Sequence, residues 1–392
     1  MEHSQTDKKK CVLIVAPSLD LATNVSGVSA VANFIIAHNS ECEYEHFLQG
    51  RSDGESGTVN RVVRIWRNYG EWKRIVNGND NVNDNDNVNL NGKVVIHYNY
   101  PLDAASIVRD FFFMKAAHQR GIPMVIHIHG GLYLFKEQKP FFIKRILSEV
   151  FSWENPFIVL SDKEREQILR LYGTKNVVVL PNCPDNLNEN DNVNDNVNEN
   201  ENVNDNENGN GNGLQMLYLG RIEPNKGMDY LLEAMKMLKE EGRSFTLHFA
   251  GVEQGKNGYI ERFQSLLEER FIYEGVVSGN QKTNLFKRCH VFVLPSFYEG
   301  LPISLLETMS YGLVPVVTDV GSIGEYVKDE ENGLLLKVKD SQSIVEAIDK
   351  LGSDGKLLKR LSKNARQTIS ERFNPTDYIK KLNSIYAQAV RS

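Results

Sequence analysis

The chain has 392 residues and a formal net charge of -6, so it is longer than one small domain and too acidic for nucleic acid to be its main partner. Its four cysteines form no C-x-x-C pair, which argues against a disulfide framework or a structural zinc site and favours a reducing compartment. There is no signal-peptide pattern and no apolar run long enough to cross a bilayer. We therefore expect a cytoplasmic protein of two ordinary domains.

Strand-like apolar runs alternate with amphipathic helical segments in both halves of the chain. This alternation predicts an α/β fold with one parallel sheet, covered by helices on both faces, in each half. A last helix is expected at residues 376–390. The expected strands are 11–16, 94–97, 124–129, 157–160 and 177–180 in the first half, and 214–219, 245–250, 291–294, 314–318 and 334–336 in the second.

Two tracts rich in Asn and Asp interrupt this pattern. They lack the apolar residues that would offset the entropy of ordering, so each is expected to be a disordered segment. Ligands of parallel α/β sheets bind at the carboxyl ends of the strands, so a ligand cleft is expected where the two domains face each other. The expected parts are a first domain at 1–183 with an Asn-rich insert at 77–92, a linker at 184–213 and a second domain at 214–372. They are followed by a C-terminal helical segment at 373–392. One arrangement considered for this segment is that it crosses back to the first domain.

The most informative stretch is 297–307, which places two carboxylates, Glu299 and Glu307, on either side of a helix start. Free backbone amides should gather at such a start, near Gly300 and Leu301, and would bind an anion. Carboxylates do not bind phosphate, so this pair is expected to accept hydrogen bonds from hydroxyls at the two ends of a phosphate-containing ligand. On spacing alone, a loop acid followed by a solvated helix acid is the simpler explanation.

A second cluster follows the expected strand 214–219, in the pattern Gly-Arg-x-x-x-x-Lys-Gly. The planar guanidinium of Arg221 and the compact charge of Lys226 would together neutralise a diphosphate. The alternative is a strand-to-helix turn with two solvated cations.

In the first half, His129 ends a strand just before two glycines that allow close backbone approach. We expect its side chain to reach the cleft, whereas His127 would lie deeper on the same face as a structural residue. Gly27, in the turn after the first strand, would let the backbone approach a diphosphate or an acceptor, with an ordinary helix-start glycine as the alternative.

In combination these motifs resemble glycosyltransferase family 4, whose members have the GT-B fold of two Rossmann-like domains facing a cleft. The resemblance also rests on the segments 293–296, 312–317 and 332–335 and extends over nearly all of the patterned chain. It implies a metal-independent, retaining transfer of a sugar from a nucleotide-diphosphate donor to a glycan or lipid-linked acceptor, in bacterial surface polysaccharide or glycolipid assembly. No cofactor is implied beyond the donor substrate.

The resemblance also implies a role for each site residue. Arg221 and Lys226 would hold the leaving diphosphate, Glu307 the ribose hydroxyls and Glu299 hydroxyls of the transferred sugar, and His129 would lie near the reacting carbon. The expected donor-binding residues are Gly27, Arg221, Lys226, Glu299, Gly300, Leu301 and Glu307, and the expected catalytic residues are His129, Glu299, Arg221 and Lys226.

Residues 136–147 mix lysines with phenylalanines and aliphatic side chains. Such a helix either lies on an anionic membrane, which would place the protein at the inner face of the membrane, or packs into the core with solvated lysines.

Two other functions stay open: a sugar-nucleotide epimerase of similar fold, which would need no acceptor, and a sugar-nucleotide-binding protein without catalysis.

Overall fold

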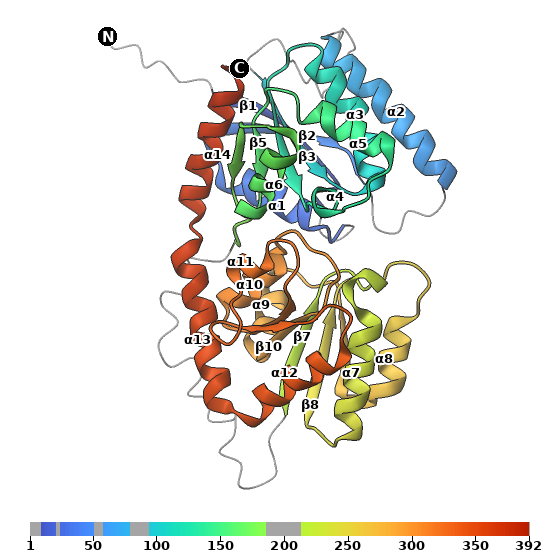
Figure 1. Cartoon of the computed structure of the whole chain (residues 1–392), viewed down its shortest axis with the longest axis vertical. Coiled ribbons are helices and arrows are strands. Elements are labelled where there is room, and N and C mark those ends of the chain that lie inside the picture. Colours follow the sequence, from blue (N-terminus) through green and yellow to red (C-terminus); the bar gives the residue numbers. More distant parts are fainter. Residues whose placement is uncertain (1–8, 21–23, 51–57, 79–93, 186–212, 392) are drawn as a thin grey trace. The chain divides into compact units, whose positions relative to one another are not determined.

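The computed structural model describes residues 9–20, 24–50, 58–78, 94–185 and 213–391. The chain forms two units, Met1–Pro181 together with Thr376–Ser392, and Asn182–Pro375 (Figure 1). Each unit is built on one six-stranded parallel sheet, which confirms the predicted α/β class. The Asn-rich insert and linker lie almost entirely outside the described residues. In the described part of the chain, no helix is both long and apolar enough to cross a membrane.

The strands of the first unit follow the order β2-β1-β3-β4-β5-β6. Their bounds are Lys10–Ala16 (β1), Cys42–Leu48 (β2), Val94–Pro101 (β3), Met124–His129 (β4), Phe157–Val159 (β5) and Val177–Val179 (β6). The central strands are buried on both faces, so they read as continuous apolar runs in the sequence. The prediction of five strands was wrong because β2 lies at the edge of the sheet, where polar residues that are exposed or partly buried, such as Glu43, Glu45 and His46, interrupt the apolar pattern.

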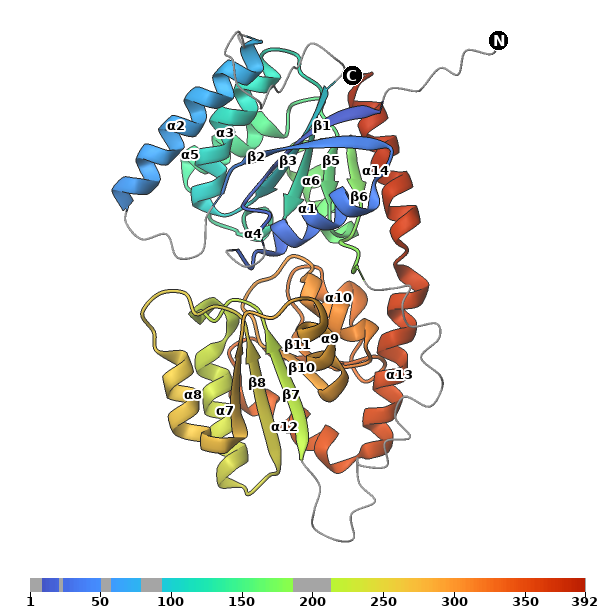
Figure 2. The same cartoon turned by 180° about the vertical axis from the view of Figure 1, so that it is seen from behind.

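Helices cover both faces of this sheet (Figure 2). One face packs against α1 (Gly27–His38) and the C-terminal helix α14 (Pro375–Ala389), which contact each other through the rings of Phe34 and Tyr378. The opposite face holds the larger apolar core. The helices around that core are α2 (Thr58–Asn77), α3 (Ala104–His118), α4 (Leu132–Phe135), α5 (Phe141–Val150) and α6 (Asp162–Tyr172).

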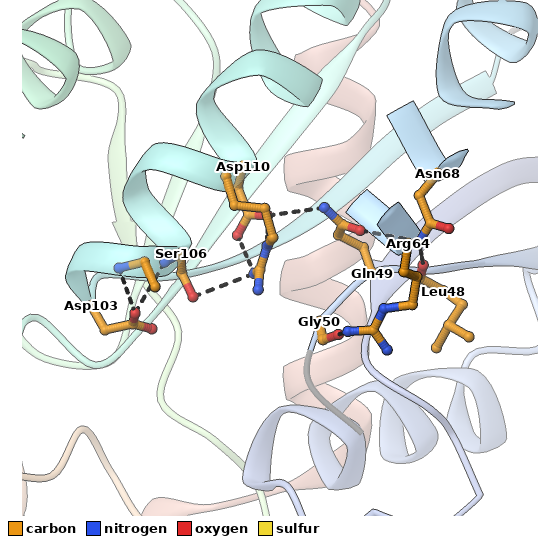
Figure 3. Close-up of polar contacts among 10 residues, drawn as sticks. Leu48, Gln49, Gly50, Arg64, Asn68, Asp103, Ser106 and Asp110 are labelled. Atoms are coloured by element: carbon orange, nitrogen blue, oxygen red, sulfur yellow. Dashed lines mark hydrogen bonds and ion pairs between the residues drawn. The ribbon is translucent and has the colours of Figure 1, made fainter. Parts of the chain in front are cut away.

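A buried polar network closes the carboxyl end of β2 (Figure 3). Asn68 of α2 donates to the Leu48 carbonyl oxygen (3.0 Å) and to Oε1 of Gln49 (3.4 Å). Gln49 in turn donates to Asp110 of α3 (3.4 Å), and Arg109 contacts the same carboxylate through two bonds of 2.6 and 2.7 Å. Buried polar groups need such partners, so the network fixes α2 and α3 against this edge strand.

The strands of the second unit follow the order β12-β11-β10-β7-β8-β9. Their bounds are Leu214–Leu219 (β7), Phe245–Ala250 (β8), Phe271–Gly275 (β9), Val291–Leu294 (β10), Val314–Thr318 (β11) and Leu334–Leu336 (β12). Again the strand missing from the prediction, β9, is an edge strand with exposed positions. The strand order reverses between β7 and β10, and ligands of such sheets bind at the carboxyl side of this reversal.

The second unit also has helices on both faces. On one face, α7 (Met228–Glu240) packs between α8 (Tyr259–Leu267) and α12 (Ser341–Ser353). On the other, α10 (Ile303–Ser310) packs against α13 (Gly355–Arg372), with α9 (Gly279–Arg288) beside it. Short elements complete the unit: α11 (Ile323–Tyr326) and the 3₁₀ turns η1 (Pro224–Lys226) and η2 (Glu268–Arg270).

Candidate functional site

The loop after β7 forms one side of the candidate site. Arg221 lies two residues after the end of the strand, and η1 (Pro224–Lys226) leads to the start of α7. Gly227 has φ +75°, and a Cβ on it would clash with the carbonyl oxygen of Pro295, so only glycine fits there. This glycine therefore fixes the path of the cationic loop against the loop that follows β10.

The loop after β10 brings a carboxylate to those cations. Oε1 of Glu299 accepts hydrogen bonds from Nζ of Lys226 and from Oγ of Ser296, both at 2.6 Å. A backbone bond from the Phe297 nitrogen to the Asn225 oxygen (2.9 Å) joins the two loops directly. β7 and β10 are neighbouring parallel strands, so residues 73 positions apart in sequence meet at one edge of the sheet. The structure thus places two predicted site residues, Lys226 and Glu299, in contact.

The turn before α10 leaves backbone amides open. The carbonyl of Gly300 accepts from the Ser322 nitrogen (3.0 Å), and that of Leu301 accepts from Nδ2 of Asn182 (2.7 Å). Pro302, the N-cap of α10, makes no side-chain cap bond. Within the described chain, the amides of Gly300 and Leu301 donate to no protein acceptor. Because its two carbonyl groups already accept hydrogen bonds and its two amides have no acceptor among the described residues, this turn is suited to binding an anion.

Glu307 lies in the second turn of α10 and is 9% exposed. Its Oε1 accepts a bond from Nζ of Lys282 on α9 (2.6 Å). Its Oε2 is buried and has no hydrogen-bond partner among the described residues. A buried carboxylate oxygen without a donor costs free energy, so a ligand hydroxyl at this position would be stabilised. Lys282 was not predicted, because a lysine in this helix has the same sequence pattern as a solvated one.

His129 is the last residue of β4 in the first unit. Nδ2 of Asn99 donates a hydrogen bond to the Val15 carbonyl oxygen (2.9 Å). The Oδ1 atom of Asn99 therefore faces the ring of His129 and accepts a hydrogen bond from its Nε2 (2.6 Å). The proton therefore resides on Nε2, and Nδ1 is left as an acceptor. Burial, with a smaller contribution from the neighbouring His97, lowers the pKa of His129 to about 3, which keeps the ring neutral. His127 is fully buried behind it, as expected.

Gly27 is the first residue of α1, and Ser26 caps that helix by accepting from the Val28 nitrogen (3.3 Å). A Cβ added to Gly27 would meet nothing within 4 Å. Local packing therefore does not demand a glycine, and its contact with the donor stays a prediction.

The segment 136–147 has a buried side and an exposed side. Ile143 and Leu147 of α5 are buried in the core. Phe141 and Phe142, in its first turn, are 79% and 56% exposed. Packing thus explains one side of the helix but not its exposed aromatic side.

The predicted residues therefore form two groups, each at the carboxyl edge of its own sheet. The first unit contains Gly27 and His129, and the second contains Arg221, Lys226, Glu299, Gly300, Leu301 and Glu307.

Comparison with known proteins finds a family similar to the second unit. Residues 199–368 match the family described as glycosyl transferases group 1. An uncharacterized glycosyltransferase of Methanocaldococcus jannaschii is 29% identical over 178 residues, which is 45% of each chain. The UDP-Gal:alpha-D-GlcNAc-diphosphoundecaprenol alpha-1,3-galactosyltransferase of Escherichia coli is 28% identical over 290 residues, which is 70% of this chain and 72% of that one.

The fold extends the likeness beyond that domain. HepE of Anabaena superposes with a TM-score of 0.66 at 15% identity, over 96% of this chain and 99% of HepE. This likeness shows the fold alone, and the match to the Methanocaldococcus relative spans about half of that relative's length. Both findings agree with the resemblance carried by the motifs. The chain therefore has the GT-B fold of two Rossmann-like domains, and its residues 199–368 are similar to the glycosyl transferases group 1 family.

Proposed function

We propose that this protein is a retaining, metal-independent glycosyltransferase that moves a sugar from a nucleoside diphosphate to a hydroxyl of a glycan or lipid-linked acceptor. The observation that carries the proposal is the contact between Lys226 and Glu299 beside the open amides of Gly300 and Leu301. A cation, an anion-binding turn and a carboxylate at one sheet edge suit a ligand that combines phosphates with hydroxyls.

Each part of the donor has a partner in this arrangement. Lys226 uses one of its three N–H donors on Glu299, which leaves two for the diphosphate, and Arg221 adds a planar fork. Both bonds to Glu299 end on Oε1, so Oε2 serves a hydroxyl of the transferred sugar. The unpartnered Oε2 of Glu307 accepts from the ribose. No cofactor beyond the donor is needed.

In the proposed reaction, the bond between the anomeric carbon and the diphosphate oxygen breaks, and a bond from the acceptor oxygen forms on the same face. Negative charge develops on the leaving phosphate, where Arg221, Lys226 and the helix-start amides stabilise it without reorganising. The acceptor proton passes to that phosphate. Nδ1 of neutral His129 accepts a hydrogen bond from a hydroxyl of the sugar.

Two relatives suggest the first substrates to test. The name of the E. coli relative specifies a UDP-galactose donor and a diphosphoundecaprenol-linked acceptor, and HepE has been solved with UDP and glucose. UDP sugars and a polyprenyl-diphosphate-linked sugar are therefore the first choices. Such an acceptor places the proposed reaction in surface polysaccharide or glycolipid assembly.

A lipid-linked acceptor would require contact with the cytoplasmic face of a membrane, and the segment 136–147 is proposed to make it. Exposed Phe141 and Phe142 would enter the interface beside Lys139 and Lys144. Reversing both lysine charges should reduce binding to anionic vesicles, whereas Lys175→Glu, an exposed lysine beyond α6, should not. Equal binding by all three proteins would contradict this contact.

The donor site is tested by thermal shift with a panel of nucleotide sugars, since a ligand that binds only the folded state raises its stability. Lys226→Ala should abolish the shift and reduce transfer by about 100-fold or more, while Lys236→Ala, an exposed lysine on α7, should retain both. Transfer should persist in EDTA. An epimerised donor formed without acceptor would indicate the epimerase, and binding without any product would indicate the non-catalytic protein.

A further inference from the structure

The candidate catalytic histidine belongs to a buried row that begins on the C-terminal helix. On α14, the hydroxyl of Tyr386 lies 2.8 Å from Nδ1 of His97 on β3. Nε2 of His97 lies 3.2 Å from Nδ1 of His127 on β4. The ring of His127 then lies against that of His129, with the centroids 4.1 Å apart. Four side chains from three elements are thus connected without a break.

The bonds in this row have a direction. Nδ2 of Asn39 donates to the hydroxyl of Tyr44 (2.8 Å), and that hydroxyl donates to Tyr386 (3.5 Å). Tyr386 therefore uses its own proton on Nδ1 of His97. Nε2 of His97 must then carry the proton that is donated to His127. The tautomers of both histidines are thereby set from α14.

The row also fixes ring orientation. Tyr386, His97 and His127 are fully buried, and burial lowers the pKa of His97 to about 3 and that of His127 well below its usual range. The imidazole rings of His97 and His127, like that of His129, are therefore neutral at physiological pH. Nε2 of His127 has no hydrogen-bond partner among the described residues, so its one bond, from His97, determines how its ring lies against His129.

We propose that Tyr386 is a positioning residue for the transfer reaction. Through His97 and His127 it holds the ring of His129 so that Nε2 meets Asn99 while Nδ1 stays available to a substrate hydroxyl. The inference rests on the proposed function, because it takes His129 to contact the transferred sugar. Loss of the Tyr386 hydroxyl leaves Nδ1 of His97 buried without a donor, and the rings beyond it lose their fixed orientation.

The test compares Tyr386→Phe with Tyr378→Phe, a tyrosine on the same helix that lies outside the row and packs on Phe34. Tyr386→Phe should lower kcat by about 10-fold or more and change KM for the nucleotide sugar less than kcat, because most of the proposed donor contacts come from the second unit. The ¹⁵N NMR signals of His97, His127 and His129 should shift in this variant. Tyr378→Phe should match the wild type in kcat and in all three signals.

Each outcome supports or contradicts the row. Unchanged kcat or unchanged histidine signals in Tyr386→Phe would overturn it, as would an equal loss of kcat in Tyr378→Phe. A wild-type protein that transfers no sugar contradicts the proposed function itself, whereas normal transfer by Tyr386→Phe contradicts the row alone. If Tyr386→Phe does not fold, Tyr44→Phe removes the hydroxyl that directs the Tyr386 proton towards His97, and the signals of His97 and His127 should shift with a smaller loss of kcat.

Discussion

Lowering the pH should weaken the first unit, because His97 would have to take up a proton in a buried site. It is fully buried, and burial lowers its pKa from 6.5 to about 3. The groups that face it are His127 from β4, Asn99 from its own strand and Tyr386 from α14, none of which carries a negative charge. Between pH 6.5 and pH 3 the unfolded state therefore binds more protons, and stability falls as the pH falls.

The size of this effect follows from the two pKa values. With a pKa near 6.5 in the unfolded state, protonation of His97 lowers the free energy of unfolding at pH 5 by RT ln(1 + 10^1.5), or about 2 kcal/mol. At pH 7 the same effect is only about 0.2 kcal/mol. His97→Gln removes the titrating group. The variant should be less stable than the wild type at pH 7, because the contacts to Tyr386 and His127 are disturbed. Its further loss between pH 7 and pH 5 should nevertheless be about 2 kcal/mol smaller than that of the wild type.

Tryptophan fluorescence during urea unfolding measures this directly, because Trp66, Trp72 and Trp153 all lie in the first unit. The free energy of unfolding would be determined at both pH values for each protein. His38→Gln, a change at an exposed histidine of α1, serves as the control and should keep the wild-type pH dependence. An identical loss in His97→Gln and the wild type would refute the reasoning.

Two further predictions concern the second unit. Gly227→Ala should destabilise it by about 3 kcal/mol or more in thermal unfolding, whereas Gly242→Ala, with a similar φ of +73° but open space around its Cβ, should cost only about 1–2 kcal/mol. Equal losses would show that backbone conformation alone accounts for the motif glycine. Lys282→Met should weaken UDP binding in calorimetry by about 10-fold, because Glu307 loses the cation that orients it, and Lys287→Met on the same helix should not. Unchanged affinity in both would argue against a ribose contact at Glu307.

The sequence predicted the buried strands better than the exposed ones. β4, β7, β8 and β10 have the expected bounds, because a central parallel strand is apolar on both faces. β2 and β9 were missed because most side chains of these edge strands are exposed or only partly buried, so neither forms a continuous apolar run. The end of β3 was missed for a different reason: Tyr98, Asn99 and Tyr100 look polar in sequence but are buried.

Motif spacing predicted the candidate site residues, but not the side chains that contact them. Lys226 and Glu299 were expected to serve one ligand, and their contact follows from the pairing of β7 with β10. Asn99 was not predicted, since its role depends on a register that pairs it with His127 and on the nearby β1 carbonyl of Val15. Such partners depend on how distant segments align, which local patterns do not encode.

The central claim is transfer of a sugar with retained configuration. Its most direct measurement is an NMR analysis of the product formed from a UDP-α-sugar and a polyprenyl-diphosphate-linked acceptor, for the wild type and Lys226→Ala. We predict that the wild type adds one sugar residue through an α-linkage and that the variant forms almost none. A β-linked product, a donor that is only hydrolysed or epimerised, or full transfer by Lys226→Ala would contradict the account.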